Sequence, residues 1–176
     1  MTRSASSRTV PHETARQAAI HTPWPADADL WEDDLAPARA EFAQFLHLAA
    51  APGPDGAPLP VTVYAATAEA EADARRRLAG AVRVVRAPYG DVWARDTGPV
   101  FVRTGEGLEA VRFRFNGWGG KYDLPGDQTI GARIAREAGA RLVIVDFVCE
   151  GGALEFDGEG AAITTRQCVL NANRNP

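Results

Sequence analysis

Residues 90–102 read GDVWARDTGPVFV, and this stretch decides the interpretation of the whole chain. Two acids, Asp91 and Asp96, stand five residues apart with Trp93 between them, and a Gly-Pro pair follows directly. We expect Asp96 and Trp93 to face a cavity, because a carboxylate can accept two N–H donors of a planar guanidinium while an indole packs against an alkyl chain or a cation. Asp96 capping a turn is the alternative. Arg95 is expected to pair with Asp91 or a neighbour.

The segment around Asp96 is the first of two stretches, about fifty residues apart, that follow one plan. Each predicts a helix, a glycine, a strand, an acid with glycine, and a hairpin whose tight turn is rich in glycine. The first stretch has strand 82–86, Asp96-Thr97-Gly98, strand 99–103 and a return strand to Phe115; the second has helix 127–138, strand 141–147, Glu150-Gly151-Gly152, strand 153–156 and strand 161–165.

Strands that alternate with single helices, with a hairpin in each stretch, predict an α/β fold of repeated mixed blades rather than one doubly wound sheet. Two such blades cannot close a ring. The plan therefore predicts further blades after Pro176 or blades supplied by another chain.

The upstream part is expected to be ordered from about residue 10. Asp33 and Asp34 can begin a helix, residues 61–65 form a β-branched and aromatic strand, and Thr67 caps a second helix that ends at Gly80. Residues 1–9 are expected to form a weakly ordered arm, because they carry almost no periodic apolar signal. Residues 10–176 are expected to form one globular unit.

Composition argues against several partner classes. The chain has 176 residues, 45% of them hydrophobic, and a formal net charge of −4. This charge gives no basic footprint for nucleic acid or an anionic membrane surface. The first residues are polar and no long uncharged apolar run follows them, so we expect a cytoplasmic protein.

Glu150 is the second candidate acid, at the strand end that corresponds to the position of Asp96. The two glycines after it allow a backbone to approach a ligand closely. Two acids from neighbouring blades can clamp a cation from two sides, or one can hold the ligand while the other handles protons. A glutamate that merely begins a solvated hairpin is the alternative.

Residues 115–121, FNGWGGK, invite comparison with a phosphate-binding loop, but they lack the required GxxxxGK[ST] spacing. We expect a loop over a pocket mouth, with Trp118 as a wall and Asn116 as a polar contact. Turn chemistry with an aromatic plug for helix 127–138 is equally consistent with these residues.

Cysteine and histidine show no catalytic pattern. Cys149 and Cys168 stand in strand-like apolar contexts without a partner at metal or redox spacing, so each is expected to be a small buried hydrophobe. His12, His21 and His47 have no acid or cysteine nearby in a catalytic arrangement, which favours structural or surface roles.

Taken in order, several segments resemble the agmatine deiminase and bacterial peptidylarginine deiminase family: PHE at 11–13, PWP and DLW within 23–31, GDVWARDTGPVFV, FNGWGGKY, EGGALEFDGEG and TTRQCVLNANRNP. The resemblance implies a pentein fold, a five-bladed β/α propeller of which this chain would form about two to three blades. It also implies hydrolysis of a guanidinium to a ureido group through a covalent intermediate on cysteine. No metal or cofactor is implied.

By motif position, the resemblance makes Asp96 the guanidinium-binding aspartate and Glu150 the acid that contacts both the guanidinium and the catalytic histidine. Trp93 becomes the aromatic beside the substrate chain, with Trp118 and Asn116 as further pocket residues. The sequence lacks the family's GHxD segment and its late glycine-rich loop with the nucleophilic cysteine, and neither Cys149 nor Cys168 stands at the nucleophile position.

Three interpretations follow from this departure. The chain is the N-terminal half of an agmatine deiminase that makes N-carbamoylputrescine in polyamine synthesis, and is inactive by itself. Alternatively, its parent acts on peptidylarginine or another guanidine, or the chain is a non-catalytic guanidinium-binding half-propeller. A small guanidine, agmatine above all, is the expected ligand, and a homo-oligomer or a separate C-terminal half is left open as partner.

Overall fold

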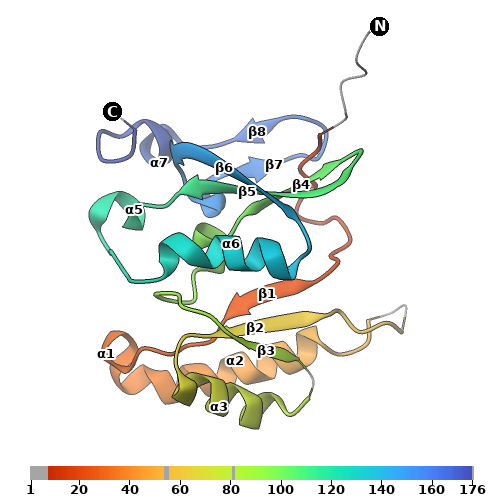
Figure 1. Ribbon diagram of the computed structural model, residues 1–176, viewed down its shortest axis with the longest axis vertical. Coiled ribbons are helices and arrows are strands. Elements are labelled where there is room, and N and C mark those ends of the chain that lie inside the picture. Colours follow the sequence, from red (N-terminus) through yellow and green to blue (C-terminus); the bar gives the residue numbers. More distant parts are fainter. Residues whose placement is uncertain (1–7, 54–55, 81, 176) are drawn as a thin grey trace, which may run out of the picture. The chain divides into compact units, whose positions relative to one another are not determined.

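The computed structural model describes residues 8–53, 56–80 and 82–175, which divide into two compact units (Figure 1). The first, called the parallel-sheet unit here, comprises residues 16–94 and 124–127. The second, called the hairpin unit, comprises residues up to 15, 95–123 and 128–176. Most of the expected N-terminal arm lies outside the described residues, but Thr9 forms an antiparallel bridge with Arg103.

The parallel-sheet unit contains three parallel strands in the order β1 (Ile20–Pro23), β2 (Val61–Ala65) and β3 (Arg83–Arg86). All five residues of β2 are buried, as expected for the β-branched central strand of a parallel sheet. The helical elements are α1 (Ala28–Trp31), the 3-10 turn η1 (Glu32–Asp34), α2 (Leu35–Ala49) and α3 (Ala68–Leu78). The core of this unit consists of Trp24, Ala43, Leu46, Val61, Val63, Ala65, Ala70, Ala74, Leu78 and Val84.

The positions predicted for the starts of the two longer helices are confirmed, but only one of the two helices has the predicted side-chain cap. Thr67 Oγ1 accepts a hydrogen bond from Ala70 N at 3.0 Å, which is the expected N-cap of α3. Asp34 precedes α2 as predicted, but its side chain makes no capping hydrogen bond. Since η1 leads directly into α2, the acidic residues lie in a helical turn instead of capping from outside.

The hairpin unit is built on a mixed sheet in the order β4 (Val100–Thr104), β5 (Gly107–Arg114) and β6 (Arg141–Val148). β4 and β5 are antiparallel, whereas β5 and β6 are parallel. Helix α6 (Asp127–Glu137) precedes β6, and β7 (Glu155–Phe156) and β8 (Ala162–Ile163) form a short antiparallel ribbon. The shorter helical elements are α4 (Ala94–Thr97), α5 (Gly117–Gly120), η2 (Gly151–Ala153) and α7 (Arg166–Leu170).

The repeated plan is confirmed in the order of the elements. Along the chain, α3 and the parallel strand β3 precede the hairpin of β4 and β5, and α6 and the parallel strand β6 precede the hairpin of β7 and β8. The prediction of mixed α/β blades is therefore correct. Two details differ: α4 gives Asp96 a helical turn instead of a simple loop, and Cys168 lies in helix α7 instead of a strand, because Thr165 caps that helix through Cys168 N at 3.2 Å.

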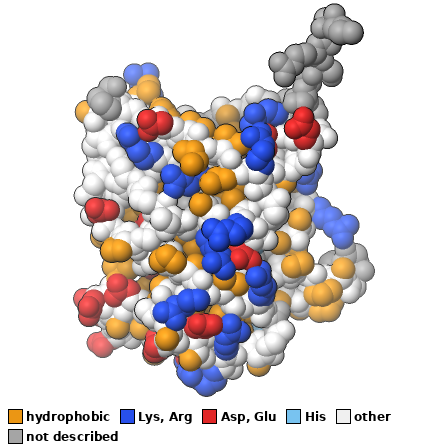
Figure 2. Space-filling model, viewed as in Figure 1, with side chains coloured by type: hydrophobic (Ala, Val, Ile, Leu, Met, Phe, Trp, Pro, Cys, Tyr) orange, Lys and Arg blue, Asp and Glu red, His pale blue; other side chains and the backbone are white. Residues whose placement is uncertain are grey.

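Charged side chains on the helices are paired locally. On the face seen in Figure 2, Lys and Arg side chains lie beside Asp and Glu side chains. Within α3, Arg75 pairs with Glu71 at 2.8 Å, and within α6, Arg133 pairs with Glu137 at 2.8 Å, both at the favourable i,i+4 spacing. Among the helices of the described residues, none is long and apolar enough to cross a membrane.

Candidate functional site

The two predicted acids come together in the hairpin unit. Asp96 lies on α4, and Glu150 lies between the end of β6 and η2. Gly152 N donates a hydrogen bond to Asp96 Oδ1 at 3.1 Å, and a Cβ at this glycine would collide with that oxygen. The glycines after Glu150 therefore allow a close approach, but to α4 of the chain itself: a Cβ on Gly151 would lie 2.5 Å from the carbonyl oxygen of Arg95.

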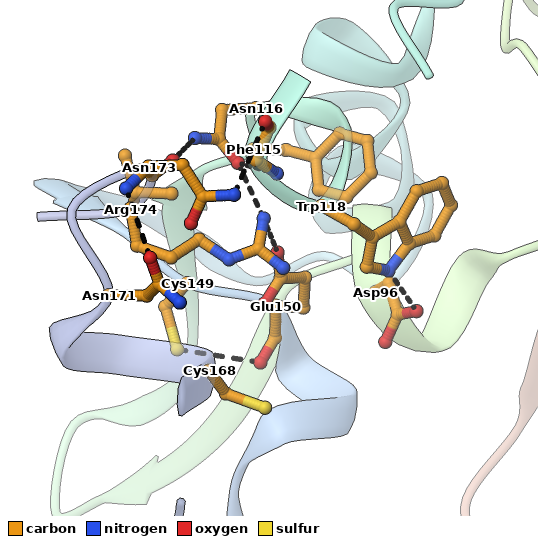
Figure 3. Close-up of polar contacts among 12 residues, drawn as sticks. Asp96, Phe115, Asn116, Trp118, Cys149, Glu150, Cys168, Asn171, Asn173 and Arg174 are labelled. Atoms are coloured by element: carbon orange, nitrogen blue, oxygen red, sulfur yellow. Dashed lines mark hydrogen bonds and ion pairs between the residues drawn. The ribbon is translucent and has the colours of Figure 1, made fainter. Parts of the chain in front are cut away.

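The second oxygen of Asp96 is held by Trp118. The indole Nε1 donates to Asp96 Oδ2 at 3.1 Å (Figure 3). Trp118 adopts a left-handed backbone with φ of 56°, a costly conformation for a residue with a side chain. Its ring packs edge-on against Phe115 and Tyr122, with centroid distances of 4.9 and 6.0 Å. The surrounding contacts thus fix the indole beside the carboxylate.

Asn116 anchors the start of the same loop. Its Oδ1 accepts hydrogen bonds from Gly119 N and from Arg174 Nη1, both at 2.9 Å. Its Nδ2 donates to the carbonyl oxygen of Asn173 at 2.8 Å. The amide therefore ties two segments of the chain together, and a contact of Asn116 with substrate stays a prediction.

Glu150 is buried, with only 3% of its surface exposed. Arg174 Nη1 lies 3.1 Å from Glu150 Oε1, but this pair lacks hydrogen-bond geometry, and within the described part of the chain Oε1 accepts no hydrogen bond. Burial raises the pKa of Glu150 above its ordinary value, the positive charge of Arg174 opposes this, and the negative charge of Asp96 adds to it. The result is a buried acid that has a charge partner and an oxygen open to a donor.

Cys149 directly precedes this acid and is 2% exposed. Burial and the neighbouring charge of Glu150 raise the pKa of the thiol to about 11, so it is protonated at neutral pH. Cys168 is partly buried, and both cysteines are free thiols. The prediction of a small buried side chain is confirmed for Cys149 and holds only in part for Cys168.

The two remaining residues singled out near Asp96 have different surroundings. Trp93 belongs to the parallel-sheet unit and is 52% exposed, so its place beside a substrate chain stays a prediction. Arg95 forms the predicted ion pair, but its main partner is Glu13 at 2.6 Å. The expected partner Asp91 instead accepts a hydrogen bond from Trp31 Nε1 at 2.9 Å.

Sequence reasoning did not single out Arg174 as a site residue, although its side chain is only 10% exposed and lies against Glu150. Residues 171–175 belong to the family-like segment TTRQCVLNANRNP, and no role was predicted for any of them. In the structure this run is fastened to the sheet, because Asn175 exchanges hydrogen bonds with both the N–H and the carbonyl of Val148 at 2.9 Å. The position of Arg174 between two asparagines was the sequence signal that could have pointed to this residue.

The histidines make local contacts. The ring of His12 forms a hydrogen bond with the hydroxyl of Thr14, and that of His21 with the hydroxyl of Tyr64. The ring of His47 forms one with the carbonyl of Arg77. In residues 8–53, 56–80 and 82–175, no three His, Cys, Asp or Glu side chains are grouped so that they could hold a metal ion.

Curated relatives match most of the chain in sequence. The agmatine deiminase of Stutzerimonas stutzeri is 38% identical over 174 residues, which make up 95% of this chain and 46% of that protein. The agmatine deiminase of Pseudomonas aeruginosa is 40% identical over 161 residues, 87% of this chain and 42% of that protein. The chain thus spans about half the length of the curated relatives it matches.

Solved structures give the same result for the fold. The agmatine deiminase of Enterococcus faecalis, described as catalysing its reaction, superimposes with a TM-score of 0.82 at 27% identity over 96% of this chain and 46% of that one. A substrate-bound C315S agmatine deiminase of C. jejuni, 23% identical, gives a TM-score of 0.79 over 99% of this chain and 50% of that one, which supports the fold alone. The predicted fold, part of a pentein propeller, is confirmed by these likenesses.

The family model for Porphyromonas-type peptidyl-arginine deiminase matches residues 9–176, which is nearly the whole chain. With the curated relatives, this match confirms the resemblance carried by the sequence motifs. The chain belongs to the Porphyromonas-type peptidyl-arginine deiminase family.

Proposed function

We propose that this chain is the guanidinium-holding part of an agmatine-deiminase-like hydrolase, with Asp96 and Glu150 as the acids that bind the substrate. The observation that carries the proposal is the hydrogen bonding of Asp96. Each carboxylate oxygen has about two acceptor positions, and Gly152 N and Trp118 Nε1 take one on each oxygen. One position per oxygen is left for the parallel N–H pair of a guanidinium.

Glu150 supplies the second contact. Its buried Oε1 accepts no hydrogen bond from the described residues, and a substrate N–H would satisfy it. Because burial raises its pKa, this acid is also suited to exchanging a proton with the reacting group. Asp96 would hold the cation, while Glu150 would contact it and take part in proton transfer.

The reaction proposed for the whole protein is agmatine plus water to N-carbamoylputrescine plus ammonia. It needs a thiolate to attack the guanidinium carbon and an imidazole to manage protons. The family's GHxD segment and its late cysteine loop do not occur in these 176 residues, and Cys149 carries a protonated thiol. We therefore expect the chain by itself to hold substrate without turning it over.

Two related functions compete with this proposal. The family description favours peptidylarginine as substrate, whereas the names of the curated relatives favour agmatine. A guanidinium-binding module without catalysis, completed by a second copy or by another chain, is the other alternative. A cytoplasmic location belongs to the proposal as well.

Isothermal calorimetry tests the guanidinium clamp. Agmatine is titrated into the wild type, into Asp96→Asn, and into the control variant Asp146→Asn. The carboxylate of Asp146 in the wild type is exposed and pairs with Arg114 at the surface. We expect binding by the wild type and the control, and binding at least about tenfold weaker in Asp96→Asn, since a hydrogen bond to a charged group contributes about 1.5–3 kcal/mol. Absence of wild-type binding, or equal affinities, would refute the clamp.

Two further ligands separate the alternatives. Putrescine has the same cationic chain without the guanidinium and is expected to bind much more weakly than agmatine. Acetyl-arginine amide represents peptidylarginine, and if it binds better than agmatine the substrate assignment changes. An ammonia-release assay on the isolated chain is expected to give no signal; turnover typical of an enzyme would contradict the proposed division of roles.

A further inference from the structure

Arg174 is the cation that stands against the buried acid of the candidate site. Its Nη1 lies 3.1 Å from Glu150 Oε1, and the two side chains are 10% and 4% exposed. Desolvated charges at this distance interact much more strongly than a surface pair. The contact therefore differs from the exposed pair of Arg114 and Asp146, whose side chains are 58% and 86% exposed.

Asn116 determines the direction of this guanidinium. Arg174 Nη1 donates to Asn116 Oδ1 at 2.9 Å, and the same oxygen accepts from Gly119 N in the loop that carries Trp118. Trp118 in turn donates to Asp96. Figure 3 shows the guanidinium of Arg174 beside Glu150 and Asn116, and the indole of Trp118 beside Asp96. The two acids are thus joined by one set of contacts that includes Arg174 and Asn116.

The backbone around Arg174 has an anchor of its own. Asn175 Oδ1 accepts from Val148 N, and Asn175 Nδ2 donates to the carbonyls of Val148 and Val169 at 2.9 and 2.8 Å. These bonds do not involve the guanidinium. The side chain of Arg174 can therefore be replaced while the segment remains fastened to β6.

We infer that Arg174 is a positioning residue of the guanidinium site: held by Asn116, it keeps the carboxylate of Glu150 charged and in place to accept an N–H of the ligand. This inference rests on the proposed function. It gives Asn116 an indirect role in binding, through Arg174, in addition to any contact with substrate.

The charge of Glu150 depends on a small set of groups. They are Arg174 from the C-terminal segment and Asp96 from α4. A titratable thiol nearby is that of Cys149, directly after β6, whose pKa responds to Glu150 and to Cys168 of α7. Burial and Asp96 raise the pKa of Glu150, whereas Arg174 lowers it. Because an opposite charge at such a distance lowers the pKa of a carboxyl by about 1–3 units, removing Arg174 should raise the pKa of Glu150 by about one unit or more.

The first experiment follows Glu150 directly by NMR titration of the 13C-labelled carboxyl, with Glu150→Gln used to assign the signal. We compare the wild type with Arg174→Gln, with Arg174→Lys, which keeps the charge but loses the planar fork, and with the matched control Arg114→Gln. The midpoint is expected to rise by at least about one unit in Arg174→Gln, to rise less in Arg174→Lys, and to stay unchanged in Arg114→Gln. An unchanged midpoint in folded Arg174→Gln would overturn the inference. If Arg174→Gln does not fold, a raised midpoint in Arg174→Lys supports the inference, and a wild-type midpoint together with wild-type agmatine affinity in Arg174→Lys overturns it.

The second experiment measures agmatine affinity from pH 5 to 9 in the same variants. Below the raised midpoint, Arg174→Gln is expected to bind more weakly than the wild type, by up to about tenfold for each unit by which the midpoint rises, and to recover as pH rises through that midpoint. Binding equal to the wild type at every pH overturns the inference and leaves the proposed function intact. If no variant binds agmatine while the NMR midpoint still shifts, the proposed function fails and the control of the charge of Glu150 by Arg174 stands.

Discussion

Two buried acids, one in each compact unit, differ in how they are satisfied. Asp73 in α3 of the parallel-sheet unit and Glu150 in the hairpin unit are each 3% exposed. Asp73 accepts hydrogen bonds from Trp24 Nε1 at 3.3 Å and from Arg77 Nε at 3.1 Å, and also pairs with Arg76. Glu150 has the charge of Arg174 beside it, but its Oε1 accepts no hydrogen bond from the described residues.

The comparison teaches that burial alone does not distinguish a structural acid from a binding acid. All the donors around Asp73 come from its own unit and saturate it, so removing the acid should strand those donors. Oε1 of Glu150 accepts no hydrogen bond from the described residues, and burial raises the pKa of this carboxyl. Such an acid keeps an acceptor position that the described residues leave unsatisfied, as the proposed binding role requires.

The largest effect is expected for Asp73→Asn. The substitution removes the carboxylate that accepts from Trp24 Nε1 and takes one of two acidic partners from the buried guanidinium of Arg39, which keeps Glu69, so we expect a loss of about 3 kcal/mol in the free energy of unfolding. Urea unfolding at pH 7 measures it. The exposed control Asp146→Asn should change the free energy by less than about 0.5 kcal/mol; a comparable loss in both would remove the distinction drawn for Asp73.

The next effect is expected for Trp118→Phe. It removes the N–H donated to Asp96 Oδ2 while keeping an aromatic ring near Phe115, so we expect a loss of about 2 kcal/mol, the value for a hydrogen bond to a charged group. Thermal and urea unfolding give the measurement. Tyr122→Phe, which keeps the ring contact with Trp118, serves as the control and should be nearly neutral.

A smaller effect is expected in the reactivity of Cys149, which reports on the surroundings of Glu150. With its pKa raised to about 11, the thiol is largely protonated at pH 8. In a Cys168→Ser background, alkylation of the folded chain should be at least about tenfold slower than that of the urea-unfolded chain. Equal rates would show that the end of β6 is more open than its burial implies.

The smallest effect is expected for Glu150→Gln. Because the pKa of Glu150 is raised in the folded state, its contribution to stability is fully present below the unfolded pKa and is lost as pH rises through the folded pKa. The neutral variant should therefore gain stability relative to the wild type over that range, which offsets the loss of the carboxylate beside Arg174. Because Arg174 keeps its hydrogen bond to Asn116, the net loss at neutral pH should be smaller than that of Asp73→Asn. A large loss at neutral pH, like that of Asp73→Asn, would erase the contrast between the two acids.

Much of the local structure could be predicted because its signals are local. The Thr67 cap, the buried strand β2 and the glycine-bearing hairpin turns each depend on neighbouring residues, and all appear in the structure. The helix α7 was missed because the apolar residues around Cys168 fit a strand equally well, and only the cap by Thr165 decides the case.

The partners of the site residues could not be predicted in the same way. Arg95 pairs with Glu13, which is 82 residues away along the chain, and Asn116 bonds Arg174, which is 58 residues away. Sequence patterns do not encode which of many possible donors meets a given acceptor at such separations. The roles expected for Trp93 and for substrate contact by Asn116 likewise stay predictions.

By itself, the sequence determined the family and the mixed α/β architecture and predicted the two candidate acids, because ordered motifs and the spacing of glycines, acids and apolar residues carry this information. Only the tertiary structure decided how each acid is used. It gives each carboxylate oxygen of Asp96 one donor, Gly152 N or Trp118 Nε1, and it places Glu150 in a buried position beside Arg174. The reason is physical: a hydrogen bond and a desolvated charge depend on distances of a few tenths of an ångström between segments far apart in the chain.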